Sequence, residues 1–252
     1  MIDVMVIGAG GRMGSLVCAT VEAQPDMRLV AMVDPCLAGS ARAGAPCFAS
    51  VPEALTLVSP KVAVEFTTPA TVFENCGITL AAGIHTVVGA TGLSAERLET
   101  LTAAAAAAGA NLFVAPNFAL GAVLLMKFAA EAARHYESAE IIEMHHDEKV
   151  DSPSGTALRT AQLMAAEGST LVARADEGQP ARGQSVAGIP VHSVRLRGLV
   201  AHQEVLFGST GETLTIRHDS LTRESFMPGV MLAIRNAPAL DGTVIGLEHL
   251  LV

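Results

Sequence analysis

The sequence is poor in aromatic residues: it has no tryptophan and one tyrosine, and aromatic residues make up 4% of its 252 residues. Half of the chain is nevertheless hydrophobic, so alanine, valine, leucine, isoleucine and methionine must fill the interior. Side chains of this kind favour helices packed in layers on a sheet. The length is enough for two modest domains that bury a core without stabilisation by disulfides or a metal ion.

Positive charge is also scarce, because 16 lysine and arginine residues stand against 25 aspartate and glutamate residues and the formal net charge is −9. A nucleic-acid partner needs a basic surface that neutralises phosphates, so this balance argues against one. No apolar run reaches the ~20 residues that a membrane-spanning helix needs, and the N-terminus lacks the basic and apolar segments of a signal peptide. We therefore expect a cytoplasmic protein with neither a membrane nor a nucleic-acid partner.

Paired cysteines are missing as well. Cys18, Cys36, Cys47 and Cys76 form no CxxC pair, and we interpret them as reduced thiols that act as small hydrophobic residues. The chain has no HExxH motif and no spaced set of cysteines and histidines, so we expect no metal site.

The first ~115 residues alternate short apolar runs with helical stretches, which is typical of a parallel α/β sheet. Periodicity predicts a helix over 12–24, and six consecutive alanines followed by Gly109 predict another over 94–108. The expected strands of this region are 4–7, 28–33, 62–66, 84–89 and 112–115.

The pattern changes after residue 120. Helices are expected over 121–137 and 154–167, the second capped by Gly168, with a strand at 139–146 between them. A loop over 168–188 follows. Strands at 191–197, 203–207 and 213–218 then come without helices between them, which indicates an antiparallel or mixed sheet in a second domain. A helix at 230–236 and a strand near 243–247 return the chain to the first domain.

A glycine-rich turn follows the first expected strand and opens the first expected helix. It reads Gly8, Ala9, Gly10, Gly11, Arg12, Met13 and Gly14. Glycines let the backbone approach a pyrophosphate closely, and the helix start offers free N–H groups and a positive dipole end. Asp34 ends the second strand, where a carboxylate can accept hydrogen bonds from the adenosine ribose hydroxyls. Together these residues predict a dinucleotide site rather than a simple turn.

The same residues set the expected cofactor. Asp34 repels a 2′-phosphate and therefore favours NADH, while Arg12 in the same turn offsets part of this repulsion. We expect NADH to be preferred, with some use of NADPH. Two further strand ends, at 66–69 and 89–92, carry small or hydroxyl-bearing residues at the edge where open parallel sheets bind ligands. Ordinary turns are the alternative interpretation of both.

The segment 143–158 holds the candidate catalytic groups. These are His145, His146, Lys149, Gly155 and Thr156. The helix that starts there, with Ser154 as its cap, is an anion site, and the lysine and imidazoles add positive charge suited to a small carboxylate. One histidine is a natural proton donor near neutral pH. A metal site, a solvated polar loop and a serine nucleophile are the alternatives, but adjacent strand residues point to opposite faces and no nucleophile elbow surrounds Ser154.

This segment resembles the signature of the 4-hydroxy-tetrahydrodipicolinate reductase family, in which two histidines and a lysine precede Asp-Ser-Pro-Ser-Gly-Thr-Ala, here 151–157. The resemblance continues in order over nearly the whole chain, through the glycine turn and the segments 65–67, 88–92, 115–118, 197–208 and 217–229. The histidine and lysine segment is highly specific for the family, whereas the glycine turn is not.

The resemblance implies a Rossmann-like dinucleotide-binding domain with a parallel sheet over 1–118, completed by 227–252. It implies a mixed α/β domain over 119–226 that binds substrate and builds a homotetramer. The implied reaction is hydride transfer from a nicotinamide to a cyclic, unsaturated dicarboxylate in lysine and diaminopimelate biosynthesis, after which the reduced ring is protonated.

The resemblance also implies roles for individual residues. His145 exchanges a proton and Lys149 is a second proton donor that contacts substrate. His146, Gly155 and Thr156 bind a substrate carboxylate. The implied cofactor contacts are residues 8–13, Asp34, Gly89, Ala90, Thr91, Ala115, Pro116, Asn117 and Phe118.

Two positions depart from the family pattern. Pro35 stands where many relatives have arginine after the strand-end acid, which weakens the expectation of NADPH binding. Ala90 stands in a stretch that commonly reads Gly-Thr-Thr-Gly, so one hydroxyl contact is missing.

Two other functions remain open from the sequence. Another two-domain Rossmann oxidoreductase of amino-acid metabolism would explain the first domain but not the histidine and lysine segment. A nicotinamide-binding regulator without turnover would not need that segment at all. His192, His202 and His218 lie on expected strands, where we expect them in the core or at an interface.

Overall fold

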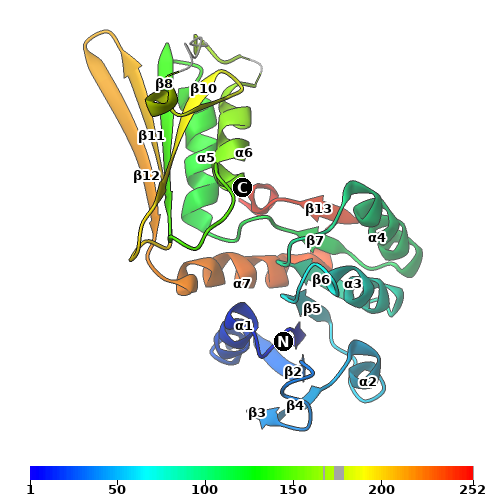
Figure 1. Ribbon diagram of the computed structural model, residues 1–252. Coiled ribbons are helices and arrows are strands. Elements are labelled where there is room, and N and C mark those ends of the chain that lie inside the picture. The colour runs from blue at the N-terminus through cyan, green and yellow to red at the C-terminus, as the bar shows by residue number, and fades with distance from the viewer. Residues whose placement is uncertain (167, 173–178, 252) are drawn as a thin grey trace. The chain divides into compact units, whose positions relative to one another are not determined.

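The computed structural model describes residues 1–166, 168–172 and 179–251 (Figure 1). The chain divides into two compact units. Unit 1 contains residues 1–118 and 226–252, and unit 2 contains residues 119–225. No helix among the described residues is both long and apolar enough to span a membrane.

Unit 1 is built on an eight-stranded sheet with the order β13-β7-β6-β5-β1-β2-β4-β3. Neighbouring strands run parallel except β3, which is antiparallel to β4. Strands β5 and β6 are buried along their whole length, as expected of a parallel sheet covered on both faces. The strands are β1 (Ile2–Ile7), β2 (Met27–Val33), β3 (Ala41–Arg42), β4 (Ala45–Phe48), β5 (Val62–Glu65), β6 (His85–Val88), β7 (Leu112–Val114) and β13 (Thr243–Ile245).

The helices of unit 1 are α1 (Arg12–Glu22), α2 (Val51–Leu55), α3 (Val72–Ala81), α4 (Ala95–Ala108) and α7 (Met227–Asn236), with 3-10 turns η3 (Ala237–Ala239) and η4 (Leu247–Leu250). Helices α2, α3 and α4 pack in sequence against one another, and α1 contacts α7. The alanine-rich α4 begins after Ser94, which accepts a hydrogen bond from the Arg97 N–H, and ends at Gly109 with φ 64°. The helix predicted over 94–108 is thus confirmed.

The C-terminal segment completes the sheet of unit 1. Strand β13 pairs in parallel with β7. The Asn111 side chain donates to the Ala237 carbonyl at 2.9 Å and accepts from the Gly242 N–H at 3.1 Å. Residues more than a hundred positions apart in sequence therefore share one sheet edge.

Unit 2 contains a five-stranded mixed sheet with the order β12-β11-β8-β10-β9. Strands β8 and β10 run parallel, and the other neighbours run antiparallel, so the mixed sheet expected from the sequence is confirmed. The strands are β8 (Ser138–His145), β9 (Gln184–Val186), β10 (Ile189–Arg195), β11 (Ala201–Ser209) and β12 (Glu212–Ser220). The helical elements are α5 (Leu120–Ala132), α6 (Gly155–Met164), η1 (Pro180–Arg182) and η2 (Arg223–Phe226).

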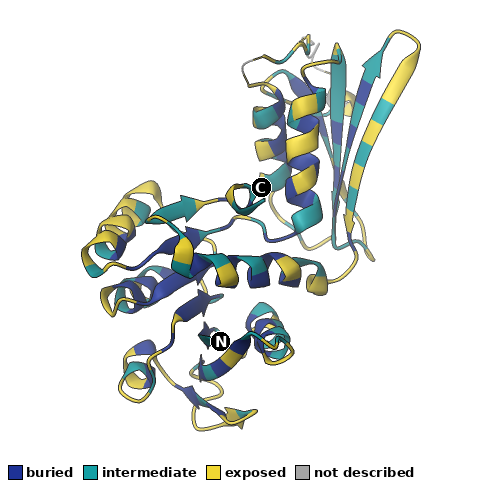
Figure 2. Cartoon of the chain, turned by 180° about the vertical axis from the view of Figure 1, so that it is seen from behind, coloured by how far each residue is buried: buried dark blue, intermediate teal, exposed yellow. Residues whose placement is uncertain are grey.

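Helices α5 and α6 cover one face of this sheet (Figure 1). Ile141, Val191 and Val205 pack there with buried alanines of both helices, and Figure 2 shows the helices buried on their sheet side and exposed on the other. Because side chains alternate along a strand, Glu143 and His145 share the covered face with Ile141. The even-numbered residues of β8 lie on the opposite face.

Two predicted helix ends were wrong. The helix expected over 121–137 ends at Ala132, because the following backbone pairs elsewhere: the Ala133 carbonyl accepts the Thr170 N–H at 2.9 Å. The helix expected over 154–167 ends at Met164 with Ala165, not Gly168, as its cap, and residue 167 lies outside the described residues.

Several helices and strands were not predicted from the sequence. The loop expected over 168–188 contains η1 and β9, while residues 173–178 lie outside the described part. Helices α2 and α3 and the β3–β4 pair were not predicted either. Each is short or carries polar residues among its apolar ones, so periodicity alone does not reveal it.

The four cysteines are free thiols. Cys18, Cys47 and Cys76 are buried and Cys36 is exposed. Burial raises the pKa of Cys18 to about 12, so this thiol stays protonated and packs as a small hydrophobic side chain.

Candidate active site

The glycine turn connects β1 to α1 at the carboxyl edge of the sheet. Gly8 has φ +82°, and its N–H donates to the Val33 carbonyl at 2.8 Å, which ties the turn to the end of β2. A Cβ at Gly14 would lie 2.0 Å from the Gly8 carbonyl oxygen, so only glycine permits this approach of helix and turn. Gly11 caps α1 without a side-chain hydrogen bond, which leaves the first N–H groups of the helix without a side-chain cap.

Asp34 follows β2 beside this turn. Its Oδ2 accepts the Gly10 N–H at 2.8 Å and its Oδ1 accepts the Cys36 N–H at 2.9 Å. A Cβ at Gly10 would lie 2.8 Å from Asp34 Oδ2. The structure therefore brings together the turn and the acid that the sequence predicted as one site.

A pocket of about 650 Å³ opens beside these residues. Its lining is apolar at Val33, Pro35, Val51, Pro52 and Ile78. Its polar lining comes from Asp34, Ser50, Thr67, Thr68, Thr71, Glu74 and Asn75. The lining residues, all within the described range 1–166, include no lysine or arginine. The pocket thus offers apolar walls together with hydroxyl, amide and carboxylate groups, and no cationic side chain among these lining residues.

Three other strand-end segments, two of them predicted to bind cofactor, meet at the same edge of unit 1. They follow β5, β6 and β7, whose carboxyl ends are neighbours in the sheet. A Cβ at Gly89 would lie 2.1 Å from the Phe66 ring, and the Phe66 and Phe118 ring centroids are 5.8 Å apart. Gly89, Ala90 and Thr91 therefore lie on the same edge as residues 115–118.

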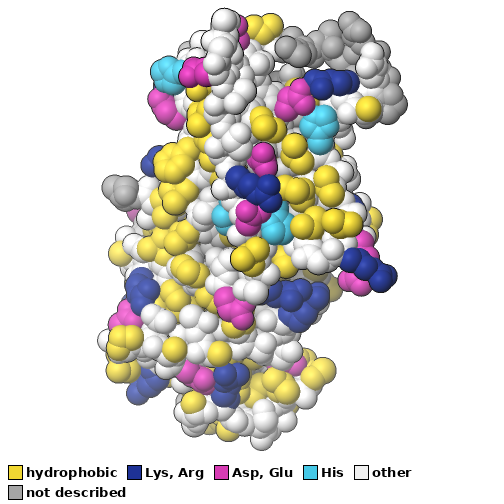
Figure 3. Space-filling model, turned by 90° about the vertical axis from the view of Figure 1, so that its left-hand side faces the viewer, with side chains coloured by type: hydrophobic (Ala, Val, Ile, Leu, Met, Phe, Trp, Pro, Cys, Tyr) yellow, Lys and Arg dark blue, Asp and Glu magenta, His cyan; other side chains and the backbone are white. Residues whose placement is uncertain are grey.

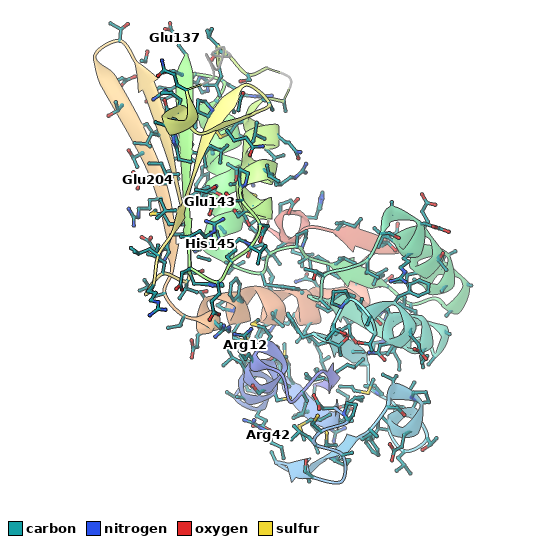
Figure 4. The ribbon with its side chains drawn as sticks, viewed as in Figure 1. Arg12, Arg42, Glu137, Glu143, His145 and Glu204 are labelled. Atoms are coloured by element: carbon teal, nitrogen blue, oxygen red, sulfur yellow. The ribbon has the colours of Figure 1, made fainter. Side chains whose placement is uncertain are left out.

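In unit 2, the candidate catalytic residues gather around Glu143. This carboxylate has no exposed surface. His145 Nδ1 lies 2.5 Å from its Oε2 (Figure 4), and the Ser154 N–H donates to its Oε1 at 3.1 Å. Arg195 on β10 donates to both carboxylate oxygens, at 2.8 and 2.9 Å.

These contacts fix the charge of Glu143. Burial by itself raises the pKa of Glu143, but hydrogen bonds from His145 and Arg195 outweigh burial and lower it to about 2. An ionised carboxylate only accepts hydrogen bonds, so Nδ1 of His145 carries a proton. Nε2 is then the nitrogen through which this imidazole, 14% exposed, can exchange a proton.

Lys149 lies in the turn between β8 and α6. Its Nζ donates to Asp151 Oδ1 and Oδ2 at 2.7 and 2.8 Å, and this contact lowers the pKa of Asp151. Arg195 holds the same turn in place, since it donates to the carbonyls of Lys149 and Asp151 at 3.3 and 2.7 Å. The ammonium is thus placed within a fixed turn, against a carboxylate that is 61% exposed.

The start of α6 has the expected cap and open space. The Ser154 hydroxyl accepts the Ala157 N–H at 3.2 Å. A Cβ at Gly155 would meet no atom within 4 Å, so a ligand group has room beside the first turn. His146 is exposed directly after β8, and Thr156 lies in that first turn.

Sequence reasoning missed two residues of this cluster. Glu143 was detectable, because it stands two positions before His145 and must share its side of the strand. Arg195 was not, because its place beside His145 depends on the parallel register of β8 and β10. Among the described residues, no cluster of three histidine, cysteine or acidic side chains is arranged to hold a metal ion.

The three histidines expected in the core or at an interface, His192, His202 and His218, have defined surroundings. His192 Nε2 lies 2.8 Å from Glu140 Oε2, and His202 Nδ1 lies 2.6 Å from Asp219 Oδ1. Both are on the face of the sheet that α5 and α6 leave uncovered. His218 lies toward α5, where a Cβ on Gly121 would come within 2.3 Å of its ring.

Comparison with known proteins identifies the family. Residues 2–118 match the family described as "Dihydrodipicolinate reductase, N-terminus", and residues 121–251 match "Dihydrodipicolinate reductase, C-terminus". The chain belongs to the dihydrodipicolinate reductase family. The family, the two-domain α/β fold and the reductase activity expected from the sequence are thereby confirmed.

Individual relatives support this membership. The chain is 49% identical over 261 residues to the 4-hydroxy-tetrahydrodipicolinate reductase of Streptomyces griseus, with 98% of this chain and 97% of the relative covered. It is also 49% identical, over 251 residues, to the reductase of Mycolicibacterium smegmatis. The solved dipicolinate-bound dihydrodipicolinate reductase from Paenisporosarcina sp. TG-14 is 41% identical with a TM-score of 0.88, covering 99% of both chains. A probable dehydrogenase from Thermotoga maritima, 13% identical with a TM-score of 0.67, shares the fold.

The depressed pKa of Glu143 predicts a pH dependence of stability. Its native pKa of about 2 lies below the ordinary 4.5, so the cluster stabilises the fold above pH 4.5 and loses this effect as pH falls toward 2. Through this carboxylate, the parent protein should lose roughly 3 kcal/mol of unfolding free energy between pH 4.5 and pH 2. The double variant Glu143→Gln/Arg195→Met removes both charges together and should lack this part of the loss. Denaturant unfolding at several pH values measures it.

The matched control for this experiment is an exposed ion pair. Arg28 and Asp3 have side-chain exposures of 60% and 31%. The double variant Arg28→Met/Asp3→Asn should therefore leave the fall in unfolding free energy at acidic pH nearly unchanged. If unfolding free energy fell equally at acidic pH in the parent and in the Glu143 double variant, the cluster would not be the source of this pH dependence.

Proposed function

We propose that this chain reduces 4-hydroxy-tetrahydrodipicolinate, through dihydrodipicolinate, to tetrahydrodipicolinate with NAD(P)H, in lysine and diaminopimelate biosynthesis. The observation that carries the proposal is the Glu143 cluster, which holds His145 in one tautomer within a chain of this family. A merely structural polar loop would not need a buried carboxylate with three different partners. The similarity of the chain to 4-hydroxy-tetrahydrodipicolinate reductases supports this activity.

We propose that unit 1 binds the dinucleotide. The glycine turn, Gly8 to Met13, and the α1 N-terminus without a side-chain cap suit its pyrophosphate, and Asp34 suits its adenosine ribose. Residues 89–91 and 115–118 lie on the same edge of the sheet, where they would contact the remaining, nicotinamide part of the dinucleotide. When bound, the nicotinamide supplies the hydride.

We propose that unit 2 holds and protonates the substrate. Lys149, His146 and the α6 start at Gly155 and Thr156 bind its carboxylates by charge and by N–H donors. After hydride addition, His145 delivers a proton from Nε2 to the electron-rich ring carbon. Glu143 stabilises the imidazolium form of His145, in the manner of a carboxylate that orients a catalytic histidine. Lys149 is the second proton donor.

The His145 assignment predicts a selective loss of turnover. His145→Gln removes the titratable nitrogen and should lower kcat by about 10²- to 10⁴-fold, while the dissociation constant of NADH changes little. Stopped-flow absorbance at the nicotinamide band and NADH fluorescence titration measure the two quantities. His135→Gln, on a side chain that is 68% exposed, is the control. Parental turnover in His145→Gln would exclude the proton-donor role.

We propose that NADH is preferred and that NADPH is used less well. Asp34 and Glu74 line the pocket, and no lysine or arginine does so within the described range 1–166, so a 2′-phosphate would find repulsion without compensation. Arg42 lies on β3 but is engaged by Glu22 at 2.9 Å. Arg12 is exposed at the start of α1, and its place in the glycine turn makes it the cation that would offset part of this repulsion.

This preference predicts the effect of one neutral substitution. Asp34→Asn keeps the shape and one acceptor oxygen but removes the charge. The ratio of kcat/KM for NADPH to that for NADH should rise about tenfold, an energy of roughly 1.4 kcal/mol. Asp241→Asn, at an exposed acid of unit 1, should leave the ratio unchanged. A parent enzyme that strongly favours NADPH would refute the preference.

We propose a homotetramer assembled through unit 2. The sheet face without helices mixes hydrophobic side chains with charged pairs (Figure 3). Partly exposed Ile142, Met144 and Val194 lie on it beside the His202–Asp219 pair. Sedimentation equilibrium should give about four times the 25.9 kDa chain mass, and Met144→Asp should dissociate the assembly because it buries a charge. A monomeric parent protein would contradict the proposal.

We place the protein in the cytoplasm, with a small-molecule cyclic dicarboxylate as its substrate. The family resemblance and the acidic balance of the chain support this placement. Fractionation of cells with an antibody against the chain would test it, since recovery with membranes or with the external medium would be incompatible.

A further inference from the structure

Arg195 uses every hydrogen-bond donor of its side chain within unit 2. A guanidinium carries five N–H groups. Its Nη1 donates to Glu143 Oε2 at 2.9 Å and to the Val194 carbonyl at 2.8 Å. Its Nη2 donates to Glu143 Oε1 at 2.8 Å and to the Asp151 carbonyl at 2.7 Å, and its Nε donates to the Lys149 carbonyl at 3.3 Å. No N–H group is left over for a substrate carboxylate, although a cation in such a place would ordinarily bind one.

These contacts lead to both residues that we propose as proton donors. The end of the guanidinium that faces Glu143 acts on His145, because Nδ1 of this imidazole lies 2.5 Å from Glu143 Oε2. The adjacent edge, formed by Nε and Nη2, reaches the turn that carries Lys149. A guanidinium is planar and its N–H groups form a fixed fork, so it sets the place of the carboxylate and of the turn relative to each other.

The turn after β8 depends on these polar contacts. Val150, at its centre, is 96% exposed, so burial of this side chain does not hold the turn. The Lys149 N–H donates to the His146 carbonyl at 3.2 Å, a bond that stays within the turn. The two carbonyls that Arg195 binds flank Val150 and tie the turn to β10. Lys149 Nζ donates to the Asp151 carboxylate, so the ammonium moves with the same backbone.

The position of Arg195 in the sheet suits this role. It pairs with His145 in the parallel register of β8 and β10, and the Leu196 N–H donates to the His145 carbonyl at 3.0 Å. The backbones of the two strands are thus joined where the candidate catalytic segment begins. The Arg195 side chain is 19% exposed, so its bonds are screened less by water than those of a surface arginine.

We propose that Arg195 is a positioning residue that keeps His145 and Lys149 at fixed places relative to one substrate ring, without itself contacting the substrate. The inference deepens the proposed function and rests on it. The lysine binds the substrate and the histidine protonates it, so their separation must be kept, and a misplacement of about 1 Å can cost about 10²-fold in rate. Arg195 should therefore affect both KM and kcat.

Arg195→Lys tests the geometry while it keeps the positive charge. The ammonium can pair with Glu143, which avoids an uncompensated buried carboxylate, but it lacks the planar fork that also reaches the turn. We expect KM for 4-hydroxy-tetrahydrodipicolinate to rise and kcat to fall by about tenfold each, because Lys149 and His145 both lose their fixed places. Steady-state kinetics at saturating NADH measures both. A merely structural role, through loss of folded protein, would lower the apparent kcat and leave KM unchanged.

Hydrogen exchange gives a readout that does not depend on activity. The amides of residues 147–151 should exchange about tenfold faster in Arg195→Lys than in the parent, while those of α5 keep the parental rate. Arg197→Lys is the comparison variant. Arg197 also contacts this turn, at 3.0 Å from Asp147 Oδ2, but its side chain is 91% exposed, so kinetics and exchange should both remain parental.

Chemical rescue separates geometry from charge. Arg195→Ala leaves a space that a free guanidinium ion can occupy. Millimolar guanidinium chloride should bring KM and kcat back toward the parental values, whereas ammonium chloride at equal ionic strength should not, because an ammonium ion has no planar fork. Equal rescue by both ions would contradict the inference, since charge alone would then suffice. If Arg195→Ala does not fold, Arg195→Lys carries the test through kinetics and exchange.

The outcomes distinguish this inference from the proposed function. A parental KM in Arg195→Lys, together with parental exchange in the turn, would overturn the positioning role while the reductase function stands. A parent protein that does not reduce the substrate would overturn both proposals.

Discussion

The candidate active site of unit 2 depends on one buried carboxylate. Glu143 has no contact with solvent, and a buried charge is tolerated only when paired and hydrogen-bonded. Arg195, His145 and the Ser154 N–H meet this need from three different segments. The same charge therefore fixes the register of β8 with β10, the position of the turn before α6, and the tautomer of the imidazole. Structure and chemistry are coupled here, since removing the acid would leave Arg195 uncompensated.

The two units use opposite electrostatic arrangements. In unit 1 the pocket beside the glycine turn is lined by apolar, hydroxyl, amide and carboxylate side chains without a lysine or arginine among its lining residues, and the turn offers backbone N–H groups to an anion. In unit 2, Arg195, His145 and a capped helix start gather around Glu143, and Lys149 pairs with the neighbouring Asp151. A chain with a net charge of −9 thus gathers positive side chains locally, where a dicarboxylate would need them. This division explains why the acidic composition does not conflict with an anionic substrate.

Much of this arrangement was predictable from the sequence, and the exceptions have physical causes. The glycine turn and Asp34 were predictable because strand ends of a parallel sheet meet at one edge. Glu143 followed from strand alternation but was overlooked. Arg195 required the register between strands separated by some fifty residues, which no local pattern encodes. The early end of α5 reflects a tertiary backbone pairing at Ala133, which overrides helix propensity.

The return of the C-terminal segment to β7 has a consequence for biosynthesis of the chain. A ribosome makes residues 243–245 after every other strand that the structure describes, yet they occupy the outermost strand beside β7 in an otherwise N-terminal sheet. Until then, the backbone of β7 remains an unsatisfied edge, open to pairing with a foreign strand. Unit 2 is continuous in sequence and meets no such delay. In a nascent chain, unit 2 can therefore fold while the sheet of unit 1 is still incomplete. Until β13 is made, other factors present during translation must protect the edge of β7.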